Sequence, residues 1–460
     1  MAKIPPLSGF PELLPQQRIV EQHILDTVRR LFELHGFSSL ETRAVEPLDQ
    51  LLRKGEMDKE VYLLRRLHAV DDEEGAAADQ LGLHFDLTVP LARYVLQNAG
   101  HLDFPYRRYQ IQKVWRGERP QEGRYREFTQ ADIDIIGRDT LAFHHEVEVA
   151  VVMAEVFAAL PIPPAVIKVN NRKLAEGFFR GAGATDPDAA LRAIDNLDKI
   201  GPDRVAALLV EDAGLDAAGA RLCLELATIT GSDATLSDRV QALGVEHPLL
   251  TEGLAELVAV VAAVNARRPQ AVLADLKIAR GLDYYTGTVF ETELVGYESL
   301  GSICSGGRYD ALASDGKVTF PGVGISLGVS RLLVPLLAGG RLTASRSVPS
   351  CVLVAVSDEG ERAASEQVAD ALRARGISTE VAPSAAKFGK QIRHADRRGI
   401  PYVWFAASEG SDHSVKDIRS GDQVPADPYG WNPPAADLHP TVTMEPRPPA
   451  TETTSEEPPQ

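Results

Sequence analysis

Cysteine is scarce in this sequence, which has three among 460 residues: Cys223, Cys304 and Cys351. They are far apart, odd in number and not arranged as C-x-x-C, which argues against a disulfide framework and against a cysteine-rich zinc site. No apolar run approaches the roughly 18–20 residues of a membrane span, and MAKIPPLSGF lacks the pattern of a secretory signal. We therefore expect a cytoplasmic protein without a membrane partner.

Positive charge is also in short supply, because the formal net charge at pH 7 is −17. Six of the acids lie after residue 425, however, and two basic clusters interrupt the remainder. Residues 106–126 hold seven Arg or Lys against two acids, and residues 387–398 hold five against one. Salt screens distant charges within about 8–10 Å, so a phosphate backbone responds to such local clusters. The composition permits an RNA partner without showing one.

The chain divides into segments of different composition. Strand and helix patterns occupy residues 1–168 and return in 273–345, whereas 169–272 is rich in Ala, Leu and Asp with helical periodicity. We interpret this middle segment as a helical insertion. Residues 348–425 alternate strands and helices at the spacing of a small, mostly parallel sheet. Residues 426–460 are rich in Pro, Thr and Glu, and we expect a disordered tail there.

The first segment that suggests chemistry spans residues 106–136. It predicts two strands, Tyr106 to Val114 and Phe128 to Ile136, joined by the Gly-, Pro- and charge-rich loop RGERPQEGRYRE. Four arginines lie on or beside this loop: Arg116, Arg119, Arg124 and Arg126. Arginine binds phosphate through two parallel hydrogen bonds. The spacing alone leaves two interpretations open, an anion-binding loop and a solvated charged loop.

Two segments with spaced glycines follow. Residues 280–287, RGLDYYTG, combine an arginine, an acid and two tyrosines with glycines, which let a backbone or a ligand approach closely. A strand with core tyrosines is the alternative. Residues 322–331, GVGISLGVSR, space glycines along a strand-to-helix turn. They form neither a Walker A loop, which requires Lys-Ser/Thr, nor a Rossmann fingerprint.

Together these segments resemble the histidyl-tRNA synthetase family of class II aminoacyl-tRNA synthetases, from residue 5 to about 425. ETRAVEP resembles motif 1, RGERPQEGRYREFTQADIDIIG motif 2, RGLDYYTGTVFE the histidine-specific segment and GVGISLGVSRL motif 3. The resemblance implies an α+β fold, in which an antiparallel sheet with flanking helices is interrupted by the helical insertion. A C-terminal α/β anticodon-binding domain would follow, and motif 1 would lie at a homodimer interface.

The resemblance also implies a two-step reaction. ATP and L-histidine would give histidyl-adenylate and pyrophosphate, and the histidyl group would then pass to the 3′ end of tRNA-His with release of AMP. Carboxylate attack on the α-phosphate builds negative charge, which cationic side chains and Mg²⁺ on the leaving pyrophosphate would stabilise. No metal ligand is expected among the protein's side chains.

Roles follow by resemblance for individual residues. Arg116, Arg280 and Arg331 would bind the phosphates of ATP and act in catalysis, with Glu118 nearby. The histidine site would comprise six residues: Asp86, Thr88, Gln130, Asp134, Tyr284 and Tyr285. Within it, Asp134 and Tyr285 would bind the ring nitrogens, while Asp86, Thr88 and Gln130 would hold the ammonium and carboxylate end. Four further residues are expected to contact tRNA: Gln121, Lys387, Lys390 and Arg393.

Plainer interpretations remain for several of these residues. Asp86 is also a suitable helix N-cap, and Asp134 is also a suitable structural partner for an arginine. The sequence departs from the family pattern at His84, where arginine is usual, and at Ser330, where glutamate is frequent. A non-catalytic, synthetase-like regulatory subunit of ATP phosphoribosyltransferase is the main alternative function. It usually lacks the anticodon domain and the ATP-binding arginines. A class II synthetase for proline or threonine is a third possibility, which RGLDYY disfavours.

Overall fold

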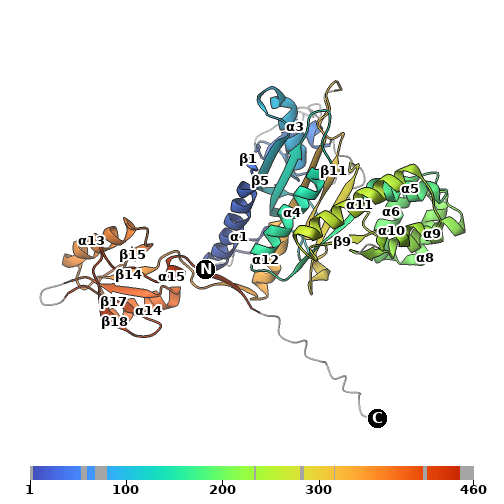
Figure 1. Cartoon of the computed structure of the whole chain (residues 1–460). Coiled ribbons are helices and arrows are strands. Elements are labelled where there is room, and N and C mark those ends of the chain that lie inside the picture. The colour runs from blue at the N-terminus through green and yellow to red at the C-terminus, as the bar shows by residue number, and fades with distance from the viewer. Residues whose placement is uncertain are drawn as a thin grey trace, which may run out of the picture. The chain divides into compact units, whose positions relative to one another are not determined.

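The computed structural model describes seven stretches of the chain: residues 4–52, 60–67, 80–232, 235–279, 284–314, 316–407 and 412–445. They form two compact units (Figure 1). The first is built on Leu25–Pro335 with the N-terminal segment to Pro11, and the second on Leu336–Gln460 with Glu12–Ile24. Helix α1 (Pro15–Leu34) contributes to both. Each unit is described by itself.

A nine-stranded sheet forms the centre of the first unit. In spatial order its strands are β1 (Ser38–Ser39), β5 (Tyr106–Trp115), β6 (Glu127–Ile136), β12 (Gly322–Gly328), β11 (Cys304–Tyr309), β10 (Thr288–Leu294), β7 (Ala165–Asn171), β9 (Val272–Asp275) and β8 (Thr230–Gly231). Pairing is antiparallel from β5 to β7, whereas β1–β5 and β7–β9 are parallel. The expected α+β class is confirmed, and so are the two long strands of the 106–136 segment.

Helices and a small second sheet complete this unit. Helix α4 (His144–Ala159) packs on β6, β7 and β12, as the apolar content of its sequence predicts. A three-stranded sheet, β2 (Val45–Pro47), β4 (Leu81–Leu83) and β3 (Leu63–Leu64), packs against α2 (Leu48–Leu51), which in turn contacts α3 (Thr88–Asn98). Helix η4 (Ala99–His101) follows α3, and η5 (Glu298–Leu300) lies against β10 of the large sheet.

The segment expected to be a helical insertion is helical. Its helices are α5 (Arg172–Gly181), α6 (Pro187–Asp195), α7 (Leu197–Ile200), α8 (Pro202–Glu211), α9 (Ala217–Ala227), α10 (Leu236–Gln241) and α11 (Pro248–Arg267). A Cβ atom at Gly177 would lie 2.2 Å from the Leu250 nitrogen, and one at Gly253 would lie 2.2 Å from the Leu174 nitrogen. Only glycine therefore lets α5 and α11 pack so closely.

By length and composition α11 is apolar enough to cross a membrane, contrary to the expectation from the sequence. The helix instead packs against α5, α4 and β7, with Leu257, Val260 and Val264 fully buried. A core helix of a folded domain meets the same compositional criterion as a membrane span.

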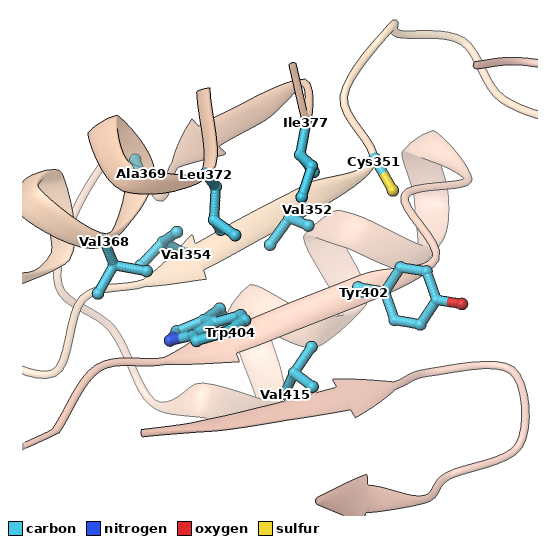
Figure 2. Packing of buried hydrophobic residues seen from close by; sticks show 10 residues of the cluster. All are labelled: Cys351, Val352, Val354, Val368, Ala369, Leu372, Ile377, Tyr402, Trp404 and Val415. Atoms are coloured by element: carbon cyan, nitrogen blue, oxygen red, sulfur yellow. The ribbon is translucent and has the colours of Figure 1, made fainter. Parts of the chain in front are cut away.

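The second unit contains a five-stranded sheet and two longer helices. The strand order is β15 (Thr379–Val381), β14 (Val352–Ala355), β16 (Tyr402–Phe405), β17 (Ser414–Asp417) and β18 (Gln423–Pro425). The first three are parallel, as predicted, and the last two are antiparallel. The helices are η6 (Glu359–Glu361), α13 (Arg362–Arg373) and α14 (Phe388–Arg398), and α12 (Val329–Ala338) leads into the unit. Figure 2 shows Trp404 between Val354 and Val415 in the core of this sheet.

The prediction of a disordered tail from residue 426 is wrong as far as residue 445. Residues 426–445 include α15 (Ala435–Leu438) and β19 (Val442–Met444), which pairs with β13 (Leu342–Ala344). Trp431 packs on Trp404 with ring centroids 5.6 Å apart, and Arg375 donates hydrogen bonds to the Pro428 and Trp431 carbonyls. A few anchoring side chains thus hold a segment whose average composition suggests disorder. The rest of the expected tail lies outside the described residues.

Candidate active site

The central strands of the first unit present a row of polar side chains on one face. Side chains alternate between faces along a strand, so three residues of β6 point the same way: Gln130, Asp132 and Asp134. Their neighbours on β5 are equally polar: Gln112, Gln110 and Arg108. On β12, by contrast, the neighbours are small: Gly328, Ser326 and Gly324. The short side chains of β12 leave space above the sheet.

Two cavities occupy this space. The larger, of about 290 Å³, is lined by side chains that include Arg116, Glu118, Phe128, Glu291 and Arg331. The smaller, of about 140 Å³, is lined among others by Asp86, Thr88, Asp132, Asp134 and Tyr309. Four longer side chains line both cavities: Arg116, Gln130, Tyr284 and Tyr285. The cavities therefore adjoin, and Arg116 lies where they meet.

All six residues expected to bind histidine line the smaller cavity. They come from the loop before α3, from the start of α3, from β6 and from the segment before β10. The Tyr284 hydroxyl donates a hydrogen bond to the Tyr285 hydroxyl, 2.7 Å away. Burial raises the pKa of the Tyr284 phenol, which therefore stays protonated and can donate.

Asp134 and Asp86 also make the structural contacts that plainer interpretations require. The Asp134 carboxylate forms a 2.7 Å ion pair with the fully buried Arg108 guanidinium and accepts a 2.7 Å hydrogen bond from the Tyr309 hydroxyl. The Asp86 carboxylate accepts a 3.0 Å hydrogen bond from the Val89 amide, as an N-cap does. A carboxylate has about four lone-pair directions, so each of these contacts leaves room for a ligand.

The structure describes three of the four residues expected to bind ATP. Arg116 donates from Nε to the Phe85 carbonyl at 3.0 Å, and its guanidinium lies 5.2 Å from the centroid of the Phe128 ring. Glu118 lies 3.6 Å from Arg116. Arg331 donates from Nε to the Leu300 carbonyl at 3.0 Å. These three line the larger cavity, whereas Arg280 lies outside the described residues.

The two departures from the family pattern have structural roles. The Ser330 hydroxyl accepts a 2.9 Å hydrogen bond from the Thr129 amide and so joins α12 to β6. His84 is fully buried, with Nε2 2.7 Å from the Lys113 carbonyl and its ring stacked on Trp115. Burial lowers the pKa of His84. A neutral imidazole at this position does not supply the charge of the arginine usual in the family.

The residues expected to contact tRNA lie on exposed surfaces. Gln121 is at the tip of the β5–β6 hairpin, where its backbone bonds to that of Arg124. In the second unit Lys387, Lys390 and Arg393 are exposed at and along the start of α14. These three residues belong to the second unit, whereas Gln121 and the two cavities belong to the first.

Comparison with known proteins gives a consistent result. The family model described as Histidyl-tRNA synthetase matches residues 9–332, and an anticodon binding domain model matches residues 350–424. The histidine–tRNA ligase of Cutibacterium acnes is 61% identical over 450 residues, which are 96% of this chain and 99% of that protein. The crystal structure of histidyl-tRNA synthetase from Nostoc sp. PCC 7120 is 35% identical with a TM-score of 0.81, covering 92% and 97% of the two chains.

The chain belongs to the histidyl-tRNA synthetase family. A further solved structure, described as an ATP phosphoribosyltransferase regulatory subunit/histidyl-tRNA synthetase from Bacillus halodurans C, has a TM-score of 0.72 at 18% identity. It covers 89% of this chain and 99% of its own. At that identity the likeness shows a shared fold alone.

Sequence reasoning missed Asp132 and Tyr309, which line the smaller cavity, and Arg108, which forms an ion pair with the cavity residue Asp134. Asp132 could have been predicted, because in QADID the polar residues alternate with Ala131 and Ile133, which are fully buried on the other face of β6. Arg108 meets Asp134 through the register of the β5–β6 hairpin, and Tyr309 reaches Asp134 from β11, which is distant in the sequence. No local pattern marks those contacts.

Gly324 is where the site depends most clearly on an absent side chain. A Cβ atom there would lie 2.1 Å from Asp134 Oδ1. We expect Gly324→Ala to displace the Asp134 carboxylate and raise the KM for histidine in ATP–pyrophosphate exchange roughly 10- to 100-fold, the usual cost of a displacement of about 1 Å. The KM for ATP should change less than about twofold, since Gly324 does not line the larger cavity.

Gly328→Ala is the matched control, because a Cβ on that strand residue meets no atom closer than 3.3 Å. Equal effects of the two substitutions on both KM values would contradict the assignment of the smaller cavity to histidine.

Proposed function

We propose that the chain ligates L-histidine to the 3′ end of tRNA-His through histidyl-adenylate, releasing pyrophosphate and then AMP. The observation that carries the proposal is the pair of adjoining cavities that share Arg116. One is rich in carboxylates and tyrosines, which suits an amino acid with an ammonium group and an imidazole. The other is lined by arginines, which suits a nucleoside triphosphate.

The first step joins the two substrates where the cavities meet. The histidine carboxylate attacks the α-phosphorus of ATP, pyrophosphate leaves, and negative charge develops on the α-phosphate oxygens. Arg116 is positioned to stabilise that charge, and Arg331 is suited to the γ-phosphate. No protein nucleophile is needed. Cys304 lines the larger cavity, but burial raises the pKa of its thiol, which stays protonated and unreactive.

Selection of histidine follows from donors and acceptors that are fixed before the substrate arrives. Arg108 and Tyr309 hold the Asp134 carboxylate, which can accept a hydrogen bond from one ring nitrogen of the imidazole. The Tyr284–Tyr285 pair offers a hydroxyl to the other. A buried site that pairs both nitrogens rejects side chains that leave its polar groups unpaired.

Magnesium fits as a companion of ATP. Among the described residues the larger cavity offers the carboxylates of Glu118 and Glu291. Mg²⁺ at nucleotide sites is usually held by one or two carboxylates and the substrate phosphates. No cluster of three or more His, Cys, Asp or Glu that could hold a metal occurs in the described part of the chain. The ion would neutralise charge on the departing pyrophosphate.

The regulatory-subunit alternative is less well supported. Arg116 and Arg331 are retained and line the larger cavity, and residues 350–424 match an anticodon binding domain.

We assign residues 1–168 and 273–345 to the catalytic core, 169–272 to the insertion and 348–425 to anticodon binding. The three cysteines are buried and unpaired, which supports a reducing compartment, the cytoplasm.

The decisive experiment is amino-acid-dependent ATP–pyrophosphate exchange with each of the twenty amino acids in turn. We expect exchange with histidine and with no other amino acid, because the smaller cavity provides partners for an imidazole. Transfer of labelled histidine to tRNA-His then tests the second step. Measurable histidine binding without exchange for any amino acid would instead favour the regulatory-subunit function.

Exposed basic residues on α14 are proposed to contact tRNA phosphates. We expect Lys390→Gln with Arg393→Gln to weaken tRNA-His binding about tenfold and to reduce the slope of log K against log salt by roughly 0.7–0.9 per lost phosphate contact. Arg373→Gln is the control, because Arg373 is exposed but paired with Asp370 at 3.0 Å. An affinity independent of salt in the unsubstituted protein would disprove this interface.

A homodimer is proposed on the exposed apolar residues around β2, β4 and β3. Leu63, Leu64 and Leu81 are 59%, 43% and 44% exposed, and Leu64 lies opposite Leu81 across β3 and β4, so this sheet has an exposed apolar surface. We expect sedimentation equilibrium at micromolar concentration to give twice the mass of the chain, and Leu63→Glu with Leu64→Glu to give the monomer. Val424→Glu, in the second unit, is the control. A monomeric parent protein would rule the dimer out.

A further inference from the structure

The smaller cavity contains a buried carboxylate to which the family motifs gave no role. Asp132 is 2% exposed and lies between Gln130 and Asp134 on the cavity face of β6. The Ser326 hydroxyl hydrogen-bonds to its carboxylate. Its Oδ1 atom has no hydrogen-bond partner among the described residues, and the same is true of Gln130 Oε1. Two buried hydrogen-bond acceptors that line one cavity are therefore available to donors of a ligand.

Carboxylates outnumber cationic side chains around the smaller cavity. Three carboxylates line it, those of Asp86, Asp132 and Asp134. Arg108 forms its ion pair with Asp134, and Arg116 lies where the larger cavity begins. Burying a carboxylate without a partner is costly. The ligand that would relieve this cost is a cation with several N–H donors.

The order of the residues along β6 indicates which group of an amino-acid substrate is this cation. Residues two apart on a strand are roughly 6.6 Å apart, so Gln130, Asp132 and Asp134 mark successive distances from Arg116. The substrate carboxylate must reach Arg116 for adenylate formation, and the α-ammonium is attached to the adjacent carbon. The ammonium therefore lies nearer Gln130 and Asp132, and the imidazole extends towards Asp134.

We infer that Asp132 binds the α-ammonium group of the amino-acid substrate directly and makes the cavity selective for amino acids over analogues that lack the amine. The inference rests on the proposed function and adds a ligand to the site. Asp132 Oδ1 and Gln130 Oε1 each accept one N–H of the ammonium, and Asp86 or Thr88 accepts the third.

A proton accompanies this binding. Burial raises the pKa of Asp132 to about 7, opposed by Arg108 and reinforced by the carboxylates of Asp134 and Asp86. Cys304 and Tyr284 also face Asp132, and both stay neutral at this pH because burial raises the pKa of each. An ammonium favours the ionised carboxylate, so it lowers the pKa of Asp132. At pH 7 histidine binding should release part of a proton, and affinity should rise as the pH rises through 7.

The test compares two ligands by calorimetry, L-histidine and 3-(imidazol-4-yl)propionate, which lacks the ammonium. Asp132→Asn keeps the shape of the side chain and removes its charge. We expect the Kd of histidine to rise roughly 10- to 100-fold, as for loss of a charged hydrogen bond, and the Kd of the propionate to stay within about twofold. Asp134→Asn is the matched variant and should weaken both ligands, because both carry the imidazole.

Equal losses for the two ligands in Asp132→Asn would show a structural role and overturn the inference, as would an unchanged Kd for histidine. Titration at pH 7 in two buffers of different ionisation enthalpy supplies a readout independent of folding: proton release should occur in the parent protein and disappear in Asp132→Asn. Failure of the parent protein to bind histidine or to support exchange would refute the proposed function itself. A parent that charges tRNA while Asp132→Asn keeps full histidine affinity would refute only the role of Asp132.

Discussion

Arg108 and Asp134 form an ion pair buried between β5 and β6, and the arrangement of the smaller cavity depends on it. A carboxylate in such a place is costly unless it is paired and hydrogen-bonded. The Arg108 guanidinium and the Tyr309 hydroxyl meet both needs. They also fix the carboxylate in one orientation, so that its remaining lone pairs face the cavity before any ligand arrives. Pre-organisation of this kind favours recognition, because little ordering is left for the binding step.

The second requirement is an absence of side chains. The long polar residues of β6 are paired with Gly324, Ser326 and Gly328 of β12. The cavity has room because these residues of β12 have small side chains or none. On β11, a Cβ at Gly307 would lie 2.8 Å from the Tyr285 ring, so this glycine gives the tyrosine its place. The spacing of glycines in the sequence is therefore explained by packing around the site, and phosphate contact is not needed to account for it.

Much of the fold could be predicted where a long element carries its own pattern. The strands of the 106–136 segment and the alternating elements after residue 348 are confirmed. The two-residue strands β1 and β8 were not predictable, because so short a segment has no periodicity. Residues 426–445 were mispredicted because composition averages over Trp431, whose ring packs on Trp404 and anchors the segment.

The site divides in the same way. Motifs placed Asp86, Thr88, Gln130, Asp134 and both tyrosines around one cavity, and the structure brings all six together. Arg108 escaped prediction because its contact with Asp134 depends on the register of the β5–β6 hairpin, and Tyr309 because β11 is far from β6 in the chain. Asp132 escaped although its alternation with buried apolar residues was visible in the sequence.

The junction of the two cavities at Arg116 bears on the fate of the intermediate. The adenylate of the proposed reaction would occupy both cavities and lose its overall translation and rotation once, whereas the two substrates would lose theirs separately. Such a mixed anhydride is thus retained more strongly than either reactant from which it forms. Retention shields a water-labile bond until an acceptor arrives, so the same geometry that joins the reactants also limits futile hydrolysis of ATP.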